Sequence, residues 1–225
     1  MIIEKCYNSV GDGMKQILKK DVEIYISDDN KLGSGKEVSV YAFQDKVIKI
    51  FHQERKTAIQ RISDDGLKKL SSLNLKCFNV PLDLIVEDNK IVGYTEKFLL
   101  PEIINKYNIP LDDLKDDIYI LSENGFQIED LFYNYIFSNN RFYFTDLTCY
   151  KYIPTNVDFL KRKFFIKNLE IVNNFLIGFL MFDAFLPGAK SEYTKIYMAN
   201  EYRRENCPDS YFGDFIKSIN EEKKK

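Results

Sequence analysis

The sequence predicts an α+β protein with two parts, a β-rich part over residues 1–98 and a mainly helical part over residues 99–225. Two observations predict this division. Stretches that alternate apolar and polar side chains, or that are rich in β-branched residues, collect before residue 100, and the long apolar stretches with helical spacing follow it. Strands that come first and helices that come second favour α+β packing over a parallel sheet with alternating helices.

The first part is expected to hold a five-stranded antiparallel sheet and one helix, after a leading segment over residues 1–20. Alternation and β-branched content predict three of the strands, and a turn rich in Asp and Asn between two apolar runs predicts the other two as a hairpin. A stripe of apolar residues predicts a helix between residues 54 and 75, interrupted near Asp64-Asp65-Gly66. The expected strands are residues 22–27, 38–43, 46–51, 81–86 and 91–94.

The second part is expected to be mainly helical. Residues 111–123 form an amphipathic pattern that ends at Asn124-Gly125, a pair typical of helix C-termini. Short aromatic strands are predicted at residues 135–137 and 141–144, and a strongly apolar helix at residues 159–185.

Composition excludes several classes of function. The 32 basic and 34 acidic side chains give a net charge of −2, which is not the footprint of a protein that binds nucleic acid or an anionic membrane. The four cysteines are scattered, and His52 is the single histidine, so zinc sites and multi-histidine sites are not expected. The N-terminus lacks a secretory pattern, so the expected location is cytoplasmic, and the many Asn, Lys, Ile and Tyr residues favour a bacterial source. Oligomeric state is left open.

The glycine turn Leu32-Gly33-Ser34-Gly35-Lys36 is the first candidate site. Glycine lets backbone N–H groups approach phosphate oxygens without a side chain in the way, although many hairpins use glycine for structural reasons alone. Lys49 follows in the middle of an apolar strand, and a buried ammonium needs a partner. A nucleotide phosphate together with a helix carboxylate would supply one, and Glu54, Asp64 and Asp65 are the acidic residues in the predicted helix.

Two aspartates form the second candidate site. Asp130 follows a helix end and precedes a strand, and Asp146 ends an aromatic strand, with Asn134 between them in the sequence. Carboxylate and amide oxygens are ligands that Mg²⁺ accepts. Each aspartate alone is also typical of a strand end or a turn, so the combination carries the interpretation.

The motifs together resemble the protein-kinase-like superfamily, over roughly residues 22–150 and in the family's order. The run from Leu32 to Tyr41 is similar to the glycine loop of RIO-type atypical kinases, and Val47-Ile48-Lys49-Ile50 to the family's V-A-I-K strand. Asp130-Leu131 is similar to the catalytic loop, and Asp146-Leu147 to the metal-binding D-F-G position.

The resemblance implies a two-lobed kinase fold that transfers a phosphoryl group from ATP, with Mg²⁺, to a protein or small-molecule hydroxyl. Lys49 would contact the phosphates, Asp146 and Asn134 would bind the metal, and Asp130 would orient or deprotonate the acceptor. The implied nucleotide-binding residues are Leu32, Gly33, Ser34, Gly35, Lys36, Val40, Lys49 and the hinge residues Glu96, Lys97 and Phe98.

Three departures from the family pattern leave alternatives open. Val38 stands at the third loop glycine, Ile128 stands two residues before Asp130 where His or Tyr is expected, and Tyr135 stands where the metal-binding Asn is expected. A nucleotide-binding pseudokinase is therefore one alternative. The other is a non-catalytic regulatory or interaction module in which the glycines and aspartates are structural.

Overall fold

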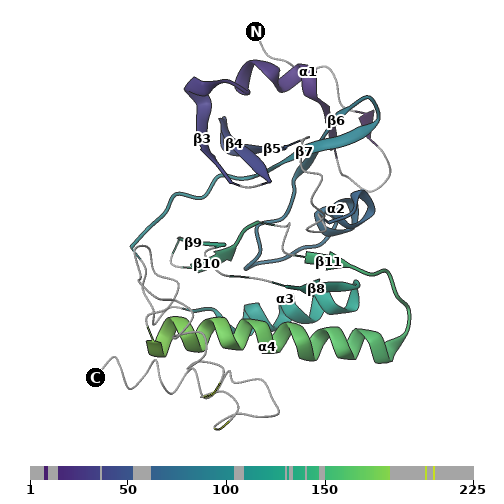
Figure 1. Ribbon diagram of the computed structural model, residues 1–225, viewed down its shortest axis with the longest axis vertical. Coiled ribbons are helices and arrows are strands. Elements are labelled where there is room, and N and C mark those ends of the chain that lie inside the picture. Colours follow the sequence, from purple (N-terminus) through teal and green to yellow (C-terminus); the bar gives the residue numbers. More distant parts are fainter. Residues whose placement is uncertain are drawn as a thin grey trace. The chain divides into compact units, whose positions relative to one another are not determined.

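The structure is a computed structural model that describes residues 8–9, 15–35, 37–52, 62–103, 109–129, 131, 134–139, 141–146, 150–182, 201 and 205. The predicted α+β class is confirmed, since the described residues form one large mixed sheet, two small sheets and several helices (Figure 1). The chain separates into two compact units. The first contains residues up to 74 and residues 79–99, and the second contains residues 75–78 and those from residue 100 onward.

The first unit is built on a seven-stranded sheet with the strand order β1-β2-β6-β7-β5-β4-β3. The five strands between residues 31 and 97 pair with one another in antiparallel fashion, and tight turns at Gln44-Asp45 and Asp88-Asn89 join two of the pairs. The strands are β1 (Asn8–Ser9), β2 (Lys15–Leu18), β3 (Lys31–Ser34), β4 (Val38–Phe43), β5 (Lys46–Phe51), β6 (Asp83–Glu87) and β7 (Lys90–Lys97).

Three predictions for this sheet are wrong. Five antiparallel strands were expected, and the sheet instead has seven strands and is mixed. Residues 1–20 are not only a leading segment, because β2 adds to the sheet in parallel with β6. The strand predicted at residues 22–27 is instead the end of helix α1 (Lys19–Val22) followed by the 3-10 helix η1 (Glu23–Tyr25). A second 3-10 turn, η2 (Asp28–Asn30), leads into β3, which takes the place of the predicted first strand.

The two faces of this sheet have different roles. Residues 48 and 50 of β5 project to one face, where they pack with Ile17, Val22 and Ile85 in a core that includes α1. Lys49 and residue 47 project to the opposite face, and the register places Tyr94 and Glu96 of β7 on that same face. We call the first the α1 face and the second the Lys49 face.

The predicted helix between residues 54 and 75 is only partly within the described residues. Helix α2 (Asp64–Ser71) begins at the point where an interruption was expected, because the Ser63 hydroxyl accepts a hydrogen bond from the Gly66 N–H and caps the helix. Leu67 and Leu70 are fully buried on its inner side.

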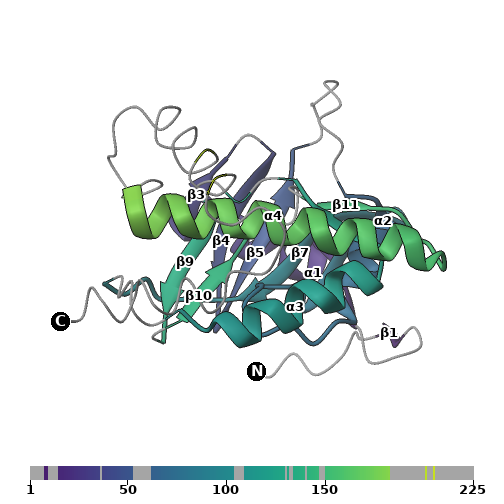
Figure 2. The same cartoon turned by 90° about the horizontal axis from the view of Figure 1, so that it is seen from below.

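Helices α3 (Leu111–Glu123) and α4 (Asp158–Phe182) form the base of the second unit and run side by side (Figure 2). The bounds of α3 agree with the prediction, and Gly125 ends it in the left-handed conformation, with φ of 82°. Two short antiparallel sheets accompany the helices. They pair β8 (Phe126–Ile128) with β11 (Tyr150–Tyr152), and β9 (Tyr135–Ser138) with β10 (Arg141–Phe144).

An aromatic core joins the β9–β10 hairpin to α4. Phe142 and Phe144 on β10 are buried against Phe175 and Phe179 of α4, with ring centroids 5.0–6.4 Å apart. Tyr135 on β9 contacts the same two α4 rings. These aromatic side chains therefore stabilise the fold of the unit and do not form a surface for stacking bases.

Asn168 of α4 holds β8 in place. Its side chain is fully buried, accepts a hydrogen bond from the Ile128 N–H at 2.7 Å, and donates to the Phe126 carbonyl and the Ser122 hydroxyl, each at 2.9 Å. Every polar atom of this amide is thus paired, and its partners are the strand that leads toward residue 130 and the helix that precedes it.

We expect Asn168→Ala to lower the free energy of unfolding by about 3 kcal/mol. The change leaves a buried N–H and a buried carbonyl on β8 without their partner, at roughly 1–3 kcal/mol for each lost interaction. Urea denaturation measures the effect, with Asn156→Ala at an exposed position as the control. A loss equal to that of the control would show that β8 does not depend on Asn168.

None of the helices within the described ranges combines the length and the apolar character that a membrane crossing requires.

Candidate functional site

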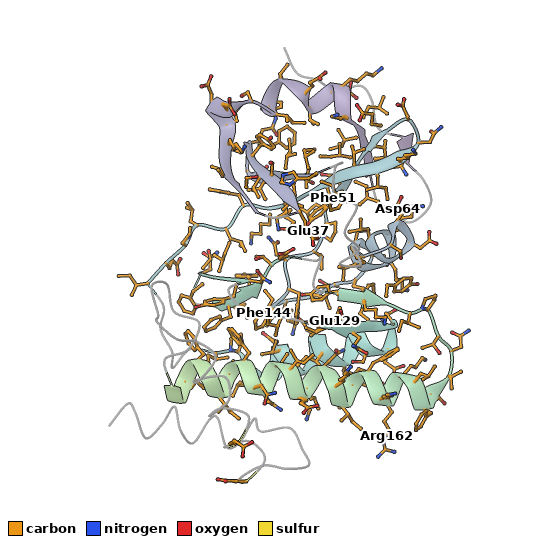
Figure 3. The ribbon with its side chains drawn as sticks, viewed as in Figure 1. Glu37, Phe51, Asp64, Glu129, Phe144 and Arg162 are labelled. Atoms are coloured by element: carbon orange, nitrogen blue, oxygen red, sulfur yellow. The ribbon has the colours of Figure 1, made fainter. Side chains whose placement is uncertain are left out.

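The glycine turn forms the β3–β4 hairpin at the edge of the large sheet. The Gly35 N–H donates to the Val38 carbonyl at 2.9 Å and closes the turn, and Glu37 lies within it (Figure 3). On the α1 face, the hydroxyls of Ser34 and Ser39 lie 3.1 Å apart, and Ser39 Oγ lies 2.9 Å from His52 Nε2. These contacts hold the two strands of the hairpin together from the side opposite Lys49.

Some of the described glycines are required by the fold, and others are not. A Cβ on Gly93 would strike the Lys49 carbonyl, and Gly125 has a positive φ and lies against Ile153, so the fold itself requires both. A Cβ on Gly33 meets nothing within 4 Å, and one on Gly35 meets only the Val38 carbonyl at 3.9 Å, among the atoms that the structure describes. Neither hairpin glycine has a positive φ. Packing therefore does not explain them, and the open space beside their backbone suits the approach of a phosphate.

Lys49 is buried on the Lys49 face and pairs with Glu96. Lys49 Nζ lies 2.9 Å from Glu96 Oε2, and the side chains are 10% and 1% exposed. Asn79 Nδ2 donates to the same carboxylate oxygen at 3.2 Å, and the ammonium also lies over the Tyr94 ring, 5.6 Å from its centroid. The partner that the sequence left unassigned is therefore a carboxylate on the neighbouring strand β7.

The predicted hinge residues have other partners within the first unit. The Lys97 carbonyl accepts a hydrogen bond from Asn79 Nδ2 at 3.0 Å, and the Phe98 N–H donates to the Asp45 carbonyl at 3.2 Å. Glu96 contributes its side chain to Lys49, in addition to its place in the β5–β7 ladder. Leu32 is exposed, Val40 pairs with Lys49 across β4 and β5, and Lys36 lies outside the described residues.

In the second unit, the β9–β10 hairpin brings the two predicted metal ligands, Asn134 and Asp146, to the same end of a ladder. The Thr145 N–H donates to the Asn134 carbonyl at 2.9 Å, which extends the pairing of the two strands by one step and sets Asp146 next to that pair. The donor set is one carboxylate and one amide, both of which suit Mg²⁺. Asp130, the predicted catalytic residue, lies outside the described residues.

Asp146 also has an unusual backbone conformation, with φ of 62°. The other described non-glycine residues with positive φ, which are Gln44, Asp88, Asn89 and Asn139, all lie in the tight turns that join paired strands. Asp146 instead follows the end of β10. Positive φ in a residue other than glycine is disfavoured and is found at functional sites, so Asp146 stands out independently of its sequence motif.

The structure explains two of the departures from the kinase pattern. Tyr135, at the position where a metal-binding Asn is expected, is half-buried and packs its ring against Phe142 at 5.4 Å. Ile128 is fully buried on β8 and pairs with Tyr150. Both side chains therefore belong to the core of the unit. Asn134, which precedes Tyr135, has a side-chain amide that could bind a metal ion.

A short segment, residues 75–78, is anchored beside this site by Asp117 of α3. The buried Asp117 carboxylate accepts hydrogen bonds from the backbone N–H groups of Lys76 and Cys77, at 2.8 and 2.6 Å. The Cys77 carbonyl in turn accepts from the Phe144 N–H at 2.7 Å. Burial raises the pKa of Asp117 from its ordinary value of 3.8 to about 6, against the lowering effect of the two backbone N–H groups.

This pKa predicts that Asp117 makes the protein less stable as pH rises from about 4 to about 7. The folded state binds the proton more tightly than the unfolded state, so unfolding releases it in that window and the free energy of unfolding falls by about 2 kcal/mol between pH 4 and pH 7. Asp117→Asn keeps an acceptor oxygen but cannot titrate. Urea denaturation at pH 4 and pH 7 should show that wild type loses this amount relative to the variant, and an unchanged difference would contradict it.

The sequence missed Glu96 and Asn79 as partners in the Lys49 cluster. Glu96 lies near the end of β7, two residues after the strand predicted at residues 91–94, but only the strand register shows which lysine it meets. Among the residues that the structure describes, no three His, Cys, Asp or Glu side chains form a group that could hold a metal by themselves. A cation at Asp146 would therefore also need the Asn134 amide, water, phosphate oxygens or residues outside the described ranges.

Comparison with known proteins gives no family assignment for these two sites. No family model matches the chain, and no curated protein matches it either.

Proposed function

We propose that the chain is an Mg-ATP-dependent phosphotransferase of the protein-kinase-like type, which transfers the terminal phosphoryl group of ATP to a hydroxyl of a protein or a small molecule. The observation that carries the proposal is Lys49, which lies on β5, the third of five successive antiparallel strands. Its ammonium is buried and pairs with the Glu96 carboxylate on β7. Protein kinases place their phosphate-binding lysine on the third strand, after a glycine-rich hairpin that covers the phosphates.

Four further features support the same function. The five antiparallel strands from β3 to β7, with α2 between β5 and β6, are compatible with the N-lobe of a two-lobed kinase fold. The hairpin glycines have no packing role among the described atoms. Asn134 and Asp146 lie at one end of the β9–β10 ladder. Asp146 also has a positive φ, although it does not lie in a tight turn between two paired strands.

Each residue has one role in the proposed reaction. Lys49 neutralises charge on the phosphates that do not transfer. Asp146 with Asn134 would hold Mg²⁺, which would supply positive charge to the phosphate oxygens. Asp130 orients the acceptor hydroxyl and accepts its proton. A bond from the acceptor oxygen to the terminal phosphorus forms, the bond from that phosphorus to the bridging oxygen breaks, and ADP leaves.

Tyr135 favours one second candidate, a pseudokinase that binds nucleotide without turnover. Its ring is committed to the aromatic core, so the usual position for the second metal ligand carries a structural residue. In protein kinases that ligand holds one of the two Mg²⁺ ions needed for transfer, so a chain without it can bind nucleotide and not turn it over.

Two measurements on the wild-type chain separate these functions. A kinase should show thermal stabilisation by millimolar Mg-ATP together with transfer of labelled phosphate from ATP, to itself or to water, and Asp130→Ala should abolish the transfer and keep the stabilisation. A pseudokinase should show the stabilisation alone. Absence of both stabilisation and transfer would leave the non-catalytic module as the better account.

A further inference from the structure

We propose that Glu96 is the positioning residue for Lys49, and that it replaces the helix carboxylate that performs this task in protein kinases. This inference rests on the proposed function and deepens it. In protein kinases the lysine is oriented by a glutamate on a helix, and movement of that helix controls whether the pair is assembled. Here the carboxylate lies on β7, in the same sheet as the lysine.

The sheet itself fixes the distance between the two charges. Strands β5 and β7 are paired over five consecutive positions, from Lys46 with Lys97 to Ile50 with Gly93. Lys49 lies opposite Tyr94, so Glu96 is its diagonal neighbour on the same face. Because the ladder fixes the two backbone positions relative to each other, the two side chains stay within reach of each other whenever the sheet is folded.

Asn79 also holds the carboxylate, through the same oxygen that pairs with Lys49. Its amide donates both to Glu96 Oε2, at 3.2 Å, and to the Lys97 carbonyl, at 3.0 Å, which ties it to the side chain and the backbone at the end of β7. The ammonium of Lys49 has three N–H donors, so it can keep Glu96 and still donate to a phosphate.

The carboxylates of α2 are placed differently. Asp65 is 84% exposed and lies 3.8 Å from Lys68 of the same helix, and Asp64 is exposed at the helix start. Within the described residues, the ion pair of Lys49 is with Glu96. We therefore infer that phosphate binding does not depend on the carboxylates of α2, and that movement of α2 does not assemble or break the pair of Lys49 with Glu96.

Nucleotide affinity across a series of ligands tests the inference. Calorimetry should show that Glu96→Gln weakens the affinity for Mg-ATP and Mg-ADP by roughly 10–100-fold and leaves the affinity for adenosine unchanged. This range is the one found when the hydrogen-bond partner of a metal-ligating side chain is removed. Glu96→Asp, which keeps the charge but withdraws it by one methylene, should give a smaller loss with the same dependence on phosphate.

Two controls separate positioning from a general loss of structure. Asp83 of β6 forms an ion pair with Lys46 of β5 at 2.7 Å, in the same sheet but on the α1 face, with side chains 6% and 30% exposed. Asp83→Asn should lower stability and leave the ratio of ATP to adenosine affinity unchanged. The double change Asp64→Asn and Asp65→Asn should also leave this ratio unchanged.

The outcomes distinguish this inference from the proposed function. If both Glu96 variants bind ATP as wild type does, or if the α2 variant loses phosphate-dependent affinity, Glu96 is not the positioning residue and the proposed function stands. If wild type binds ATP no better than adenosine, the proposed function fails first.

Discussion

Replacing Asp146 with asparagine is expected to reduce phosphoryl transfer by at least about 10²–10³-fold, the loss typical when one group that stabilises transition-state charge is removed. The carboxylate supplies negative charge to the cation, and an amide of the same size does not. Asparagine tolerates positive φ nearly as well as aspartate, so the backbone after β10 should keep its conformation. Release of labelled phosphate from ATP, measured over a range of Mg²⁺ concentrations, gives the effect.

The Asp146 prediction has a matched control in Asp88→Asn. Asp88 is also an aspartate with positive φ, at 48°, but it lies in the β6–β7 turn. Asp88→Asn should leave the rate of phosphoryl transfer unchanged. Equal rates for wild type and Asp146→Asn would mean that Asp146 does not bind the metal, whatever its conformation reflects.

Replacing Lys49 with methionine should abolish nucleotide binding and also destabilise the fold. The change removes the cation from the Lys49 face and leaves Glu96 buried without its ion-pair partner, which costs about 3–5 kcal/mol when one member of a buried pair is removed. Thermal denaturation with and without Mg-ATP measures both effects. The variant should melt at a lower temperature, and Mg-ATP should not shift it.

The double variant Lys49→Met with Glu96→Gln separates these two losses. With both charges removed, no unpaired charge remains in the sheet, and Asn79 can still donate to the glutamine carbonyl oxygen. Stability should therefore return to near that of wild type, while nucleotide binding should stay lost. Recovery of ATP binding in the double variant would show that Lys49 has only a structural role.

Most elements with a strong local signal were predicted from the sequence, and the exceptions have local reasons. Helix α3 was predicted with its bounds because its apolar stripe ends at Asn124-Gly125. The strand predicted at residues 22–27 failed because Val22, Tyr25 and Ile26, which have helical spacing, pack in the core. Ile24, which alternation would have placed beside Val22 and Ile26, is 70% exposed. Strand β2 was missed because its partner β6 lies about seventy residues later and pairs in parallel, which leaves no local pattern.

The sequence predicted which types of residue form the candidate site, but it predicted only some of the contacts between them. A buried lysine in an apolar strand was visible from the sequence, and so was the need for a counter-charge. The identity of that counter-charge depends on strand register over 47 positions, from Lys49 to Glu96, and a search that favours helix carboxylates selects Glu54, Asp64 or Asp65. The conformation of Asp146 likewise depends on how β10 ends, which its motif does not specify.

The central claim is that Lys49 touches the phosphates of a bound nucleotide, and an acyl phosphate derivative of ATP tests it most directly. Such a probe transfers its acyl group to the amine of a lysine beside the phosphates, with formation of an amide and release of ATP. Lys49 is the buried lysine of the described residues, so it should react only when a nucleotide brings the probe to it. We expect mass spectrometry to find Lys49 acylated and the label to disappear in excess Mg-ATP. Labelling spread over exposed lysines, with Lys49 unmodified and no protection by ATP, would contradict the account.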